Sequence, residues 1–233
     1  MSDLPGGAIS NRPLRFYWVL DVSGSMAGEK IGQLNYAIKR ALPAMKAEAD
    51  NNPHAAVEIK TLTFGTGFNW MSSSPVPLDQ YSWTDVQANG ITDMGAAMKA
   101  MAAELSLGNM PERALPPVVV LVTDGQPTDD YDSGLQAFLA EPWGRKAIRI
   151  GVGIGGDAAL DTLRKFIDHP EIEPLSANNP ENLVNYIRWA STQVLKAASA
   201  PASRPPGSAS VTSTPMDNLP EPPAADVDAE DVW

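Results

Sequence analysis

Short apolar runs alternate with longer segments of helical period over most of this chain, and that alternation limits the folds open to it. Residues 118–122 read VVVLV, a run without polar alternation that is typical of a strand buried on both faces of a parallel sheet. Strands that alternate with helical segments indicate βαβ units around one mainly parallel sheet. We predict strands at residues 15–20, 56–64, 117–123 and 147–152, and helices at residues 30–50, 94–105, 133–140, 158–168 and 180–197.

Weaker signals add three expectations. A short strand is predicted at residues 172–175, and an antiparallel strand near Tyr81 within a hairpin at residues 68–83. Pro43 lies inside the first long helical segment, where proline removes a backbone hydrogen bond, so a kink or a break is expected there.

A change of composition near residue 198 divides the chain. Residues 1–14 form an N-terminal extension, residues 15–197 a single domain, and residues 198–233 a tail rich in proline, alanine and serine that we expect to be disordered. The tail contains six acids and one arginine. It either keeps the protein soluble, binds a partner through its terminal Trp233, or occupies the domain's own binding site.

Composition excludes several classes of function. A net charge of -11 argues against duplex nucleic acid or an anionic membrane as the main partner, because both need a positive surface. Without cysteine there is no disulfide framework and no thiolate site. The first residues lack a signal-peptide pattern, and no apolar run approaches the ~18 residues that span a bilayer. We therefore expect a soluble cytoplasmic protein.

Oxygen-bearing side chains follow two of the predicted strands. Asp21, Ser23 and Ser25 come after the first strand, and Asp124 follows the VVVLVT strand. Because the carboxyl ends of parallel strands meet at one edge of the sheet, these side chains can converge, and the hydroxyl of Thr92 can join them. Carboxylate, hydroxyl and water oxygens suit a hard cation such as Mg²⁺.

Three motifs together resemble the metal-ion-dependent adhesion site of von Willebrand factor type A domains: DVSGSM at 21–26, Thr92 in a glycine-flanked loop, and TDGQPTD at 123–129. The resemblance implies a doubly wound, mainly parallel sheet with helices on both faces. It implies a Mg²⁺ site, with Mn²⁺ or Ca²⁺ as alternatives, and a protein partner that donates an Asp or Glu to the ion. The implied ligands are Asp21, Ser23, Ser25, Thr92 and Asp124.

Within that family the chain is similar to the cytoplasmic bacterial branch associated with tellurium resistance, the TerY-like proteins. This similarity implies a non-enzymatic adaptor or scaffold in a stress-response or defence signalling module, together with a protein kinase and a phosphatase of the PP2C type.

Further acids lie near these motifs. Asp93 follows Thr92 directly and either strengthens metal binding or repels an acidic partner. Asp129, Asp130 and Asp132 extend a negative rim, cap the following helix or are simply solvated.

An enzyme is the alternative. Gly151, Gly153 and Gly156 fit the G-x-G-x-x-G fingerprint of a dinucleotide site, although they follow a late strand rather than the first. Metal-assisted hydrolysis is the other possibility. His54 and His169 are the only histidines, both beside a proline, and neither is an evident general base.

Overall fold

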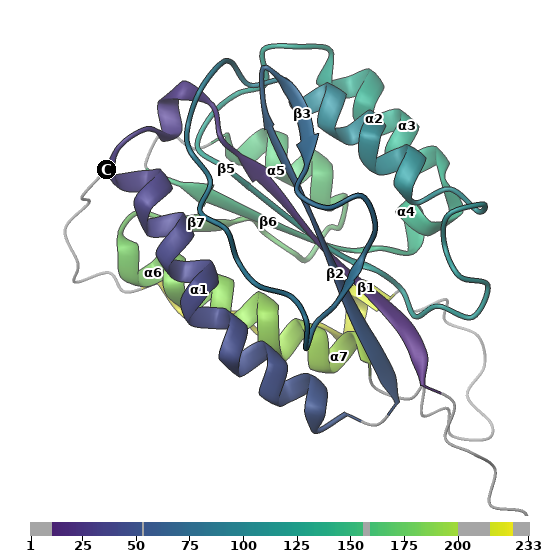
Figure 1. Cartoon of the computed structure of the whole chain (residues 1–233). Coiled ribbons are helices and arrows are strands. Elements are labelled where there is room, and N and C mark those ends of the chain that lie inside the picture. Colours follow the sequence, from purple (N-terminus) through teal and green to yellow (C-terminus); the bar gives the residue numbers. More distant parts are fainter. Residues whose placement is uncertain (1–10, 53, 156–158, 200–214, 226–233) are drawn as a thin grey trace, which may run out of the picture.

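One mixed sheet forms the centre of the molecule, with strand order β3-β2-β1-β5-β6-β7 and β4 paired to β2. The computed structural model (Figure 1) describes residues 11–52, 54–155, 159–199 and 215–225. Among the strands of the described residues, four neighbouring pairs are parallel, and β3 and β4 run antiparallel to β2. The strands are β1 (Arg12–Asp21), β2 (Ala55–Gly65), β3 (Gly67–Trp70), β4 (Val76–Pro77), β5 (Val118–Thr123), β6 (Ile148–Ile154) and β7 (Leu175–Ala177).

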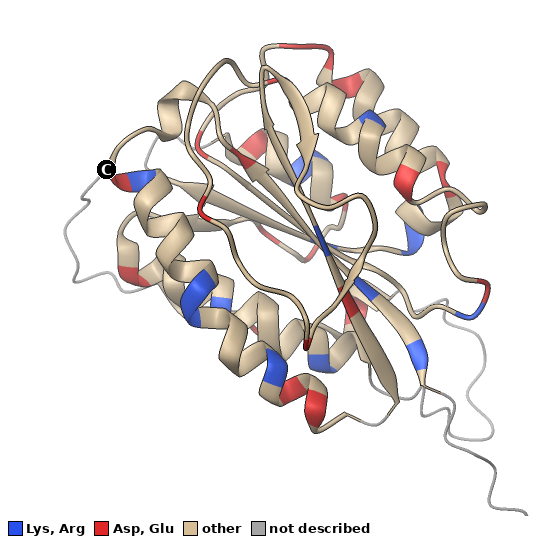
Figure 2. Cartoon of the chain, viewed as in Figure 1, with Lys and Arg blue, Asp and Glu red and all other residues tan. Residues whose placement is uncertain are grey.

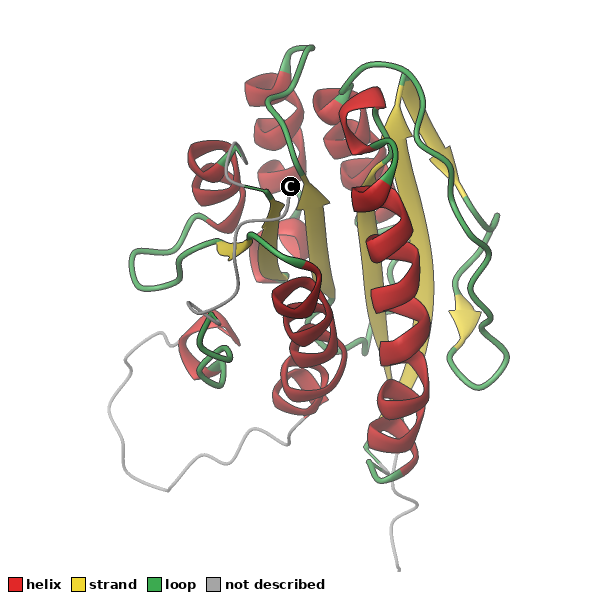
Figure 3. Cartoon of the chain, turned by 90° about the vertical axis from the view of Figure 1, so that its left-hand side faces the viewer, coloured by secondary structure: helices red, strands yellow, loops and turns green. Residues whose placement is uncertain are grey.

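Helices cover both faces of the sheet, which confirms the predicted doubly wound α/β fold. Helices α1, α6 and α7 lie on one face, and α2 to α5 on the other (Figures 1 and 3). The helices are α1 (Glu29–Asp50), α2 (Met94–Glu104), α3 (Tyr131–Ala140), α4 (Pro142–Lys146), α5 (Leu160–Ile167), α6 (Pro180–Trp189) and α7 (Leu195–Ser199). Three short elements complete them: the 3₁₀ helices η1 (Gly24–Met26) and η3 (Pro215–Asn218), and the π-helix η2 (Ala190–Val194).

The register of the central strands brings their carboxyl ends to one edge. Leu20 of β1 lies opposite Val122 of β5, and Asp21 lies opposite Phe64 of β2. Every residue of β5 is buried, as the VVVLV run predicts for a central parallel strand. The residues after β1 and β5 therefore emerge side by side above the core.

Several element boundaries differ from the predictions for identifiable reasons. The strand expected at 172–175 begins only at Leu175, because Pro174 cannot donate a ladder hydrogen bond. Helix α1 continues through Pro43, which lies on its exposed side, where water can satisfy the freed carbonyl. Tyr81 is not in a strand, and its hydroxyl is 2.8 Å from that of Thr61. The antiparallel partners of β2 are β3 and β4 instead.

Both ends of the domain differ in part from the expected boundaries. Strand β1 starts at Arg12, inside the segment assigned to the extension. The expectation of a disordered tail is wrong for residues 215–225, here called the C-terminal segment, because they begin with η3 and bury the side chain of Met216. Trp233 lies outside the described residues.

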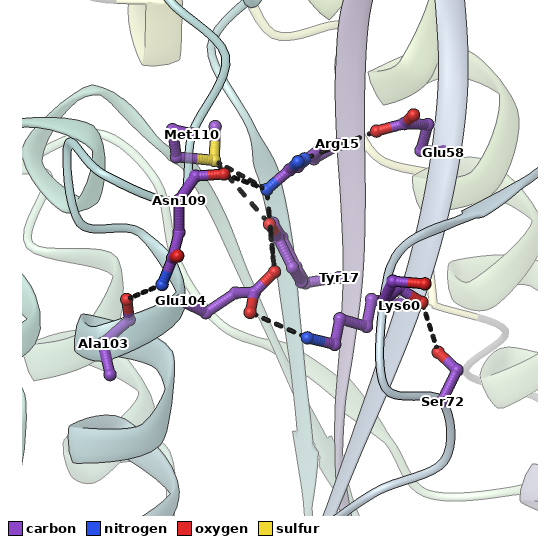
Figure 4. Close-up of polar contacts among 10 residues, drawn as sticks. Arg15, Tyr17, Glu58, Lys60, Ser72, Ala103, Glu104, Asn109 and Met110 are labelled. Atoms are coloured by element: carbon purple, nitrogen blue, oxygen red, sulfur yellow. Dashed lines mark hydrogen bonds and ion pairs between the residues drawn. The ribbon is translucent and has the colours of Figure 1, made fainter.

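A polar network is buried between the sheet and the end of α2 (Figure 4). Glu104 accepts hydrogen bonds from Lys60 Nζ at 2.7 Å and from the hydroxyl of Tyr17 at 3.3 Å. Arg15 lies 3.4 Å from Glu58 and 3.7 Å from Glu104, so acids and bases balance. Burial, followed by the charge of Glu104, raises the pKa of Tyr17. We assign this network a structural role, since its polar groups satisfy one another.

Charged residues are otherwise dispersed. In the view of Figure 2, lysines and arginines are interspersed with acids and form no continuous basic stripe. No helix in the described part of the chain has both the length and the apolar character needed to cross a membrane.

Candidate functional site

Asp21 ends β1 as a fully buried carboxylate. Its Oδ1 accepts the backbone N–H of Ser23 at 2.8 Å, and its Oδ2 accepts the hydroxyl of Thr123 at 2.6 Å. Among the described residues no lysine or arginine forms an ion pair with it. Burial raises the pKa of Asp21, the nearby charge of Asp124 adds to the rise, and the hydrogen bonds from Thr123 and Ser23 oppose it.

The two serines connect this strand end to the next one. The hydroxyl oxygens of Ser23 and Ser25 are 3.0 Å apart, and Ser25 donates to Asp124 Oδ1 at 2.7 Å. Lys30, in the first turn of α1, donates from Nζ to Asp124 Oδ2 at 2.7 Å. The structure thus brings Asp21, Ser23, Ser25 and Asp124 together, as the strand-end argument predicts.

Thr92 is buried in a loop that lies between the loop after β1 and the loop after β5. The backbone N–H of Gly24 donates to Gly90 O at 2.9 Å, just before Thr92. On the other side, Thr92 N–H donates to Thr128 Oγ1 at 3.1 Å, and Thr128 N–H donates back to Thr92 O at 2.9 Å. In the described part of the chain, the Thr92 hydroxyl makes no hydrogen bond with the cluster formed by Asp21, Ser23, Ser25 and Asp124.

The additional acids have structural partners. Asp93 accepts the N–H of Gly67 at 2.7 Å, which ties its loop to β3. Asp129 accepts the N–H groups of Gly95 and Ala96 at 2.7 and 2.8 Å, so it caps α2 rather than the helix that follows it in sequence.

The next two acids serve the following helix. Asp130 is the N-cap of α3 and accepts the N–H of Ser133, and Asp132 pairs with Lys165. The expectation that these acids cap the following helix is therefore confirmed for Asp130, whereas Asp129 caps the preceding helix α2.

Sequence reasoning missed two residues that contact the site directly. Lys30 supplies the cation next to Asp124, and Thr123 supplies the hydroxyl on Asp21. Thr123 carried a signal, since it is the one polar residue of an otherwise apolar strand. Lys30 carried none, because the rotation of α1 about its axis decides where its side chain points.

The donor set fits a hard divalent cation. Two buried carboxylates share the cluster with a single lysine, so one negative charge has no counter-charge, and the neutral donors are hydroxyl oxygens. Among the described residues there is no group of three or more His, Cys, Asp and Glu placed to hold a metal. A site here would therefore rely on hydroxyl oxygens as much as on carboxylates.

The glycines that fit the dinucleotide-binding fingerprint do not form a phosphate-binding loop in the described part of the chain. Gly151 and Gly153 lie inside β6 rather than in a loop, and Gly156 is outside the described residues. A Cβ on Gly151 would be 3.1 Å from Leu163 Cβ, so this glycine lets α5 pack closely against the strand.

Comparison with known proteins gives a family and a fold. A model of the family described as von Willebrand factor type A domain matches residues 17–188. A search of the curated proteins found no match.

Solved structures resemble this one at low sequence identity. A von Willebrand factor type A protein from Catenulispora acidiphila has 16% identity and a TM-score of 0.59 over 78% of this chain and 42% of its own. The ArnB paralog VWA2 from Sulfolobus acidocaldarius has 16% identity and a TM-score of 0.58 over 77% of this chain and 45% of its own. Proximal thread matrix protein 1 from the mussel byssus has 14% identity and a TM-score of 0.57 over 78% of this chain and 48% of its own, and it is described with zinc in its metal-ion-dependent adhesion site (MIDAS) motif. This chain thus spans less than half of each, and the likeness shows the fold alone.

Proposed function

The chain belongs to the von Willebrand factor type A domain family, and from this premise we propose that it binds a protein partner through a divalent metal ion. The ion is Mg²⁺ in this proposal, with Mn²⁺ or Ca²⁺ as alternatives. The proposed ligands, directly or through water, are Asp21, Ser23, Ser25, Thr92 and Asp124.

The observation that carries the proposal is the buried carboxylate of Asp21. It is fully buried and lies close enough to Asp124 for the two charges to repel. A buried carboxylate without a counter-charge costs several kcal/mol, and a cation between the two acids reduces that cost. The mussel protein described with zinc at its MIDAS motif supports a divalent ion at this place in the fold.

The surrounding groups suit recognition of an acidic side chain. Ser23, Ser25 and Thr92 are neutral donors, so a bound cation keeps part of its positive charge. Lys30 adds a further positive group beside Asp124. A carboxylate from a partner's Asp or Glu then completes the metal coordination, and hydrogen bonds among the loops hold the ligands in position.

The finer assignment follows the resemblance of the motifs. We propose a TerY-like adaptor or scaffold, cytoplasmic and bacterial, that works in a tellurium-resistance or related stress or defence module with a protein kinase and a PP2C-type phosphatase. We infer binding rather than catalysis because, among the described residues, neither histidine forms a hydrogen bond with the strand-end cluster. His54 precedes β2, at the opposite end of that strand from Asp21, and His169 pairs with Asp217 at 2.9 Å.

Calorimetric titration with Mg²⁺ and Mn²⁺ tests the site. Wild type is expected to bind one ion, and Asp124→Asn, which keeps the shape of the side chain but not its charge, is expected to bind at least about tenfold more weakly. Asp85→Asn is the matched control, because Asp85 forms an exposed ion pair away from the cluster. Equal affinity in all three proteins would refute the site.

Affinity capture then tests the function. A tagged wild-type protein should retain a partner in Mg²⁺ and lose it in EDTA, and Asp124→Asn should not retain it in either buffer. If the same proteins are captured in all conditions, the metal site is not the recognition surface.

A further inference from the structure

The outer edge of β6 is only partly covered by its neighbour. Strand β7 pairs with residues 152–154 and leaves residues 148–151 without a strand partner on that side in the described part of the chain. Ile148 N–H donates to Pro117 O, toward β5. Because successive backbone N–H groups of a strand point to opposite sides, the N–H of Arg149 points to the open edge. Such an edge is a ready template for another segment of chain.

The C-terminal segment, yellow in Figure 1, covers this open edge. Met216 is 4% exposed, and its Sδ accepts the N–H of Arg149 at 3.1 Å. Leu219 packs against the core, and Asp217 Oδ1 lies 2.9 Å from His169 Nε2. Two apolar side chains three residues apart thus anchor the segment, and polar contacts at Met216 and Asp217 orient it.

The segment does not fill the groove in which it lies. A cavity of about 650 Å³ remains between it and the walls formed by β6, α5, β7 and α6, a volume within the range of ligand sites. Its apolar lining residues include Ile150, Ile167, Leu175, Tyr186 and Trp189.

Acids outnumber bases around this cavity. Glu171 and Glu173 belong to its walls, and the segment itself adds Asp217 and Glu221. Glu173 pairs with Arg164 at 2.7 Å and Asp217 lies beside His169, so Glu171 and Glu221 carry the excess negative charge among the described residues. No lysine or arginine is among the described residues that line it. The segment therefore has apolar anchors that suit the groove and an acid that does not.

We propose that this groove is a peptide-binding site whose intramolecular ligand is the C-terminal segment. The partner that displaces the segment is a proline-containing stretch of another protein, with two apolar anchors three residues apart and a basic residue where this chain has Glu221. The site is distinct from the metal cluster: Arg149 lies opposite Val119 near the start of β5, whereas Asp124 follows the end of that strand.

Tethering sets the size of the expected effect. Residues 200–214 connect the segment to the domain, and a short tether gives an effective concentration on the order of 1 mM. A segment whose intrinsic dissociation constant is about one-tenth of that concentration occupies the groove about nine-tenths of the time and weakens a competing ligand about tenfold.

The test uses the full-length protein and a fluorescent peptide of residues 215–225, followed by fluorescence anisotropy. One receptor is wild type, and the other carries Met216→Asp and Leu219→Asp, which unseat the segment. The peptide is expected to bind the variant about tenfold more tightly than wild type. A peptide with Glu221→Lys should bind the variant more tightly still, with an advantage that disappears in high salt. Equal affinity for the two receptors, or no binding to the folded variant, would overturn the proposal.

A second variant covers the case in which the double substitution unfolds the protein. Asp217→Asn weakens the contact with His169 and leaves both apolar anchors in place, and it should improve binding of the peptide about threefold. An unchanged affinity contradicts the proposal. Asp124→Asn should bind the peptide as wild type does, so the fate of this site is separate from that of the metal site.

Discussion

Replacing Lys30 by methionine tests the electrostatic account of the strand-end cluster. Lys30 Nζ lies 2.7 Å from Asp124 Oδ2, and the exposed fractions of the two side chains are 23% and 1%. Methionine keeps the length of the aliphatic chain and removes the charge. In a chelator, the variant holds two buried carboxylates with no cation beside them.

The magnitude follows from burial and separation. At an effective dielectric constant of about 20, two charges at this distance attract by roughly 6 kcal/mol, before the cost of removing them from water. Breaking one side of a buried pair costs about 3–5 kcal/mol. We take the lower end, about 3 kcal/mol, because Lys30 is partly exposed and Ser25 still donates to Asp124. For a domain of this size that corresponds to a fall in Tm of about 6–12 °C.

The assay is thermal unfolding in EDTA and in Mg²⁺. The variant should lose stability in EDTA and recover more than wild type does when Mg²⁺ is added, since the ion replaces the missing charge. Lys39→Met is the matched control: it lies on the same helix and pairs with Asp85 at the same 2.7 Å, but both side chains are about half exposed. That change should cost less than about 1 kcal/mol. A Lys30→Met protein within 2 °C of wild type in EDTA would refute the reasoning.

Three further predictions follow from the same structure. Thr123→Val removes the hydroxyl that donates to Asp21 and should lower the free energy of unfolding by about 1–2 kcal/mol, measured by urea unfolding in EDTA. No loss would mean that this hydrogen bond is not formed in solution. Gly134→Ala puts a Cβ 2.3 Å from Gly95 O, where α2 crosses α3, and should lower the free energy of unfolding by about 1–3 kcal/mol. The control is Gly32→Ala in α1, where a Cβ would have nothing within 4 Å, and its effect on stability should be neutral or favourable. Equal effects of the two changes would contradict the close helix crossing. Burial raises the pKa of Asp21 above 3.8, so the folded state holds this proton more tightly than the unfolded chain does. In EDTA, the stability of wild type relative to Asp21→Asn should therefore fall as pH rises from about 4 through the raised pKa. A relative stability that rises with pH over this window would contradict the prediction.

The sequence predicts the fold and the convergence of Asp21 with Asp124 for one physical reason. Apolar runs without alternation indicate parallel strands, and parallel strands deliver their carboxyl ends to a shared edge. Neither inference requires knowledge of how helices pack. The start of β7 at Leu175, by contrast, depended on one proline whose effect is local and easily overlooked.

Lys30 and the C-terminal segment could not be predicted because each depends on tertiary packing. The direction of Lys30 follows from the rotation of α1 against the sheet. Met216 and Leu219 are two apolar residues in a stretch rich in proline and acids, too sparse to give a periodic signal. The groove that receives them is formed by elements distant in sequence, so nothing local to the tail indicates it.

The loop that carries Thr92 is hydrogen-bonded to the first loop through Gly90 and to the third through Thr128. These bonds are formed when the domain folds, so the entropy of ordering the three loops is lost then and not when an ion arrives. Pre-organised oxygens adapt poorly to ions of different radius, and Ca²⁺ needs longer bonds and more ligands than Mg²⁺. Ion selectivity in this chain would then follow from the backbone connections between loops as much as from the identity of the ligands.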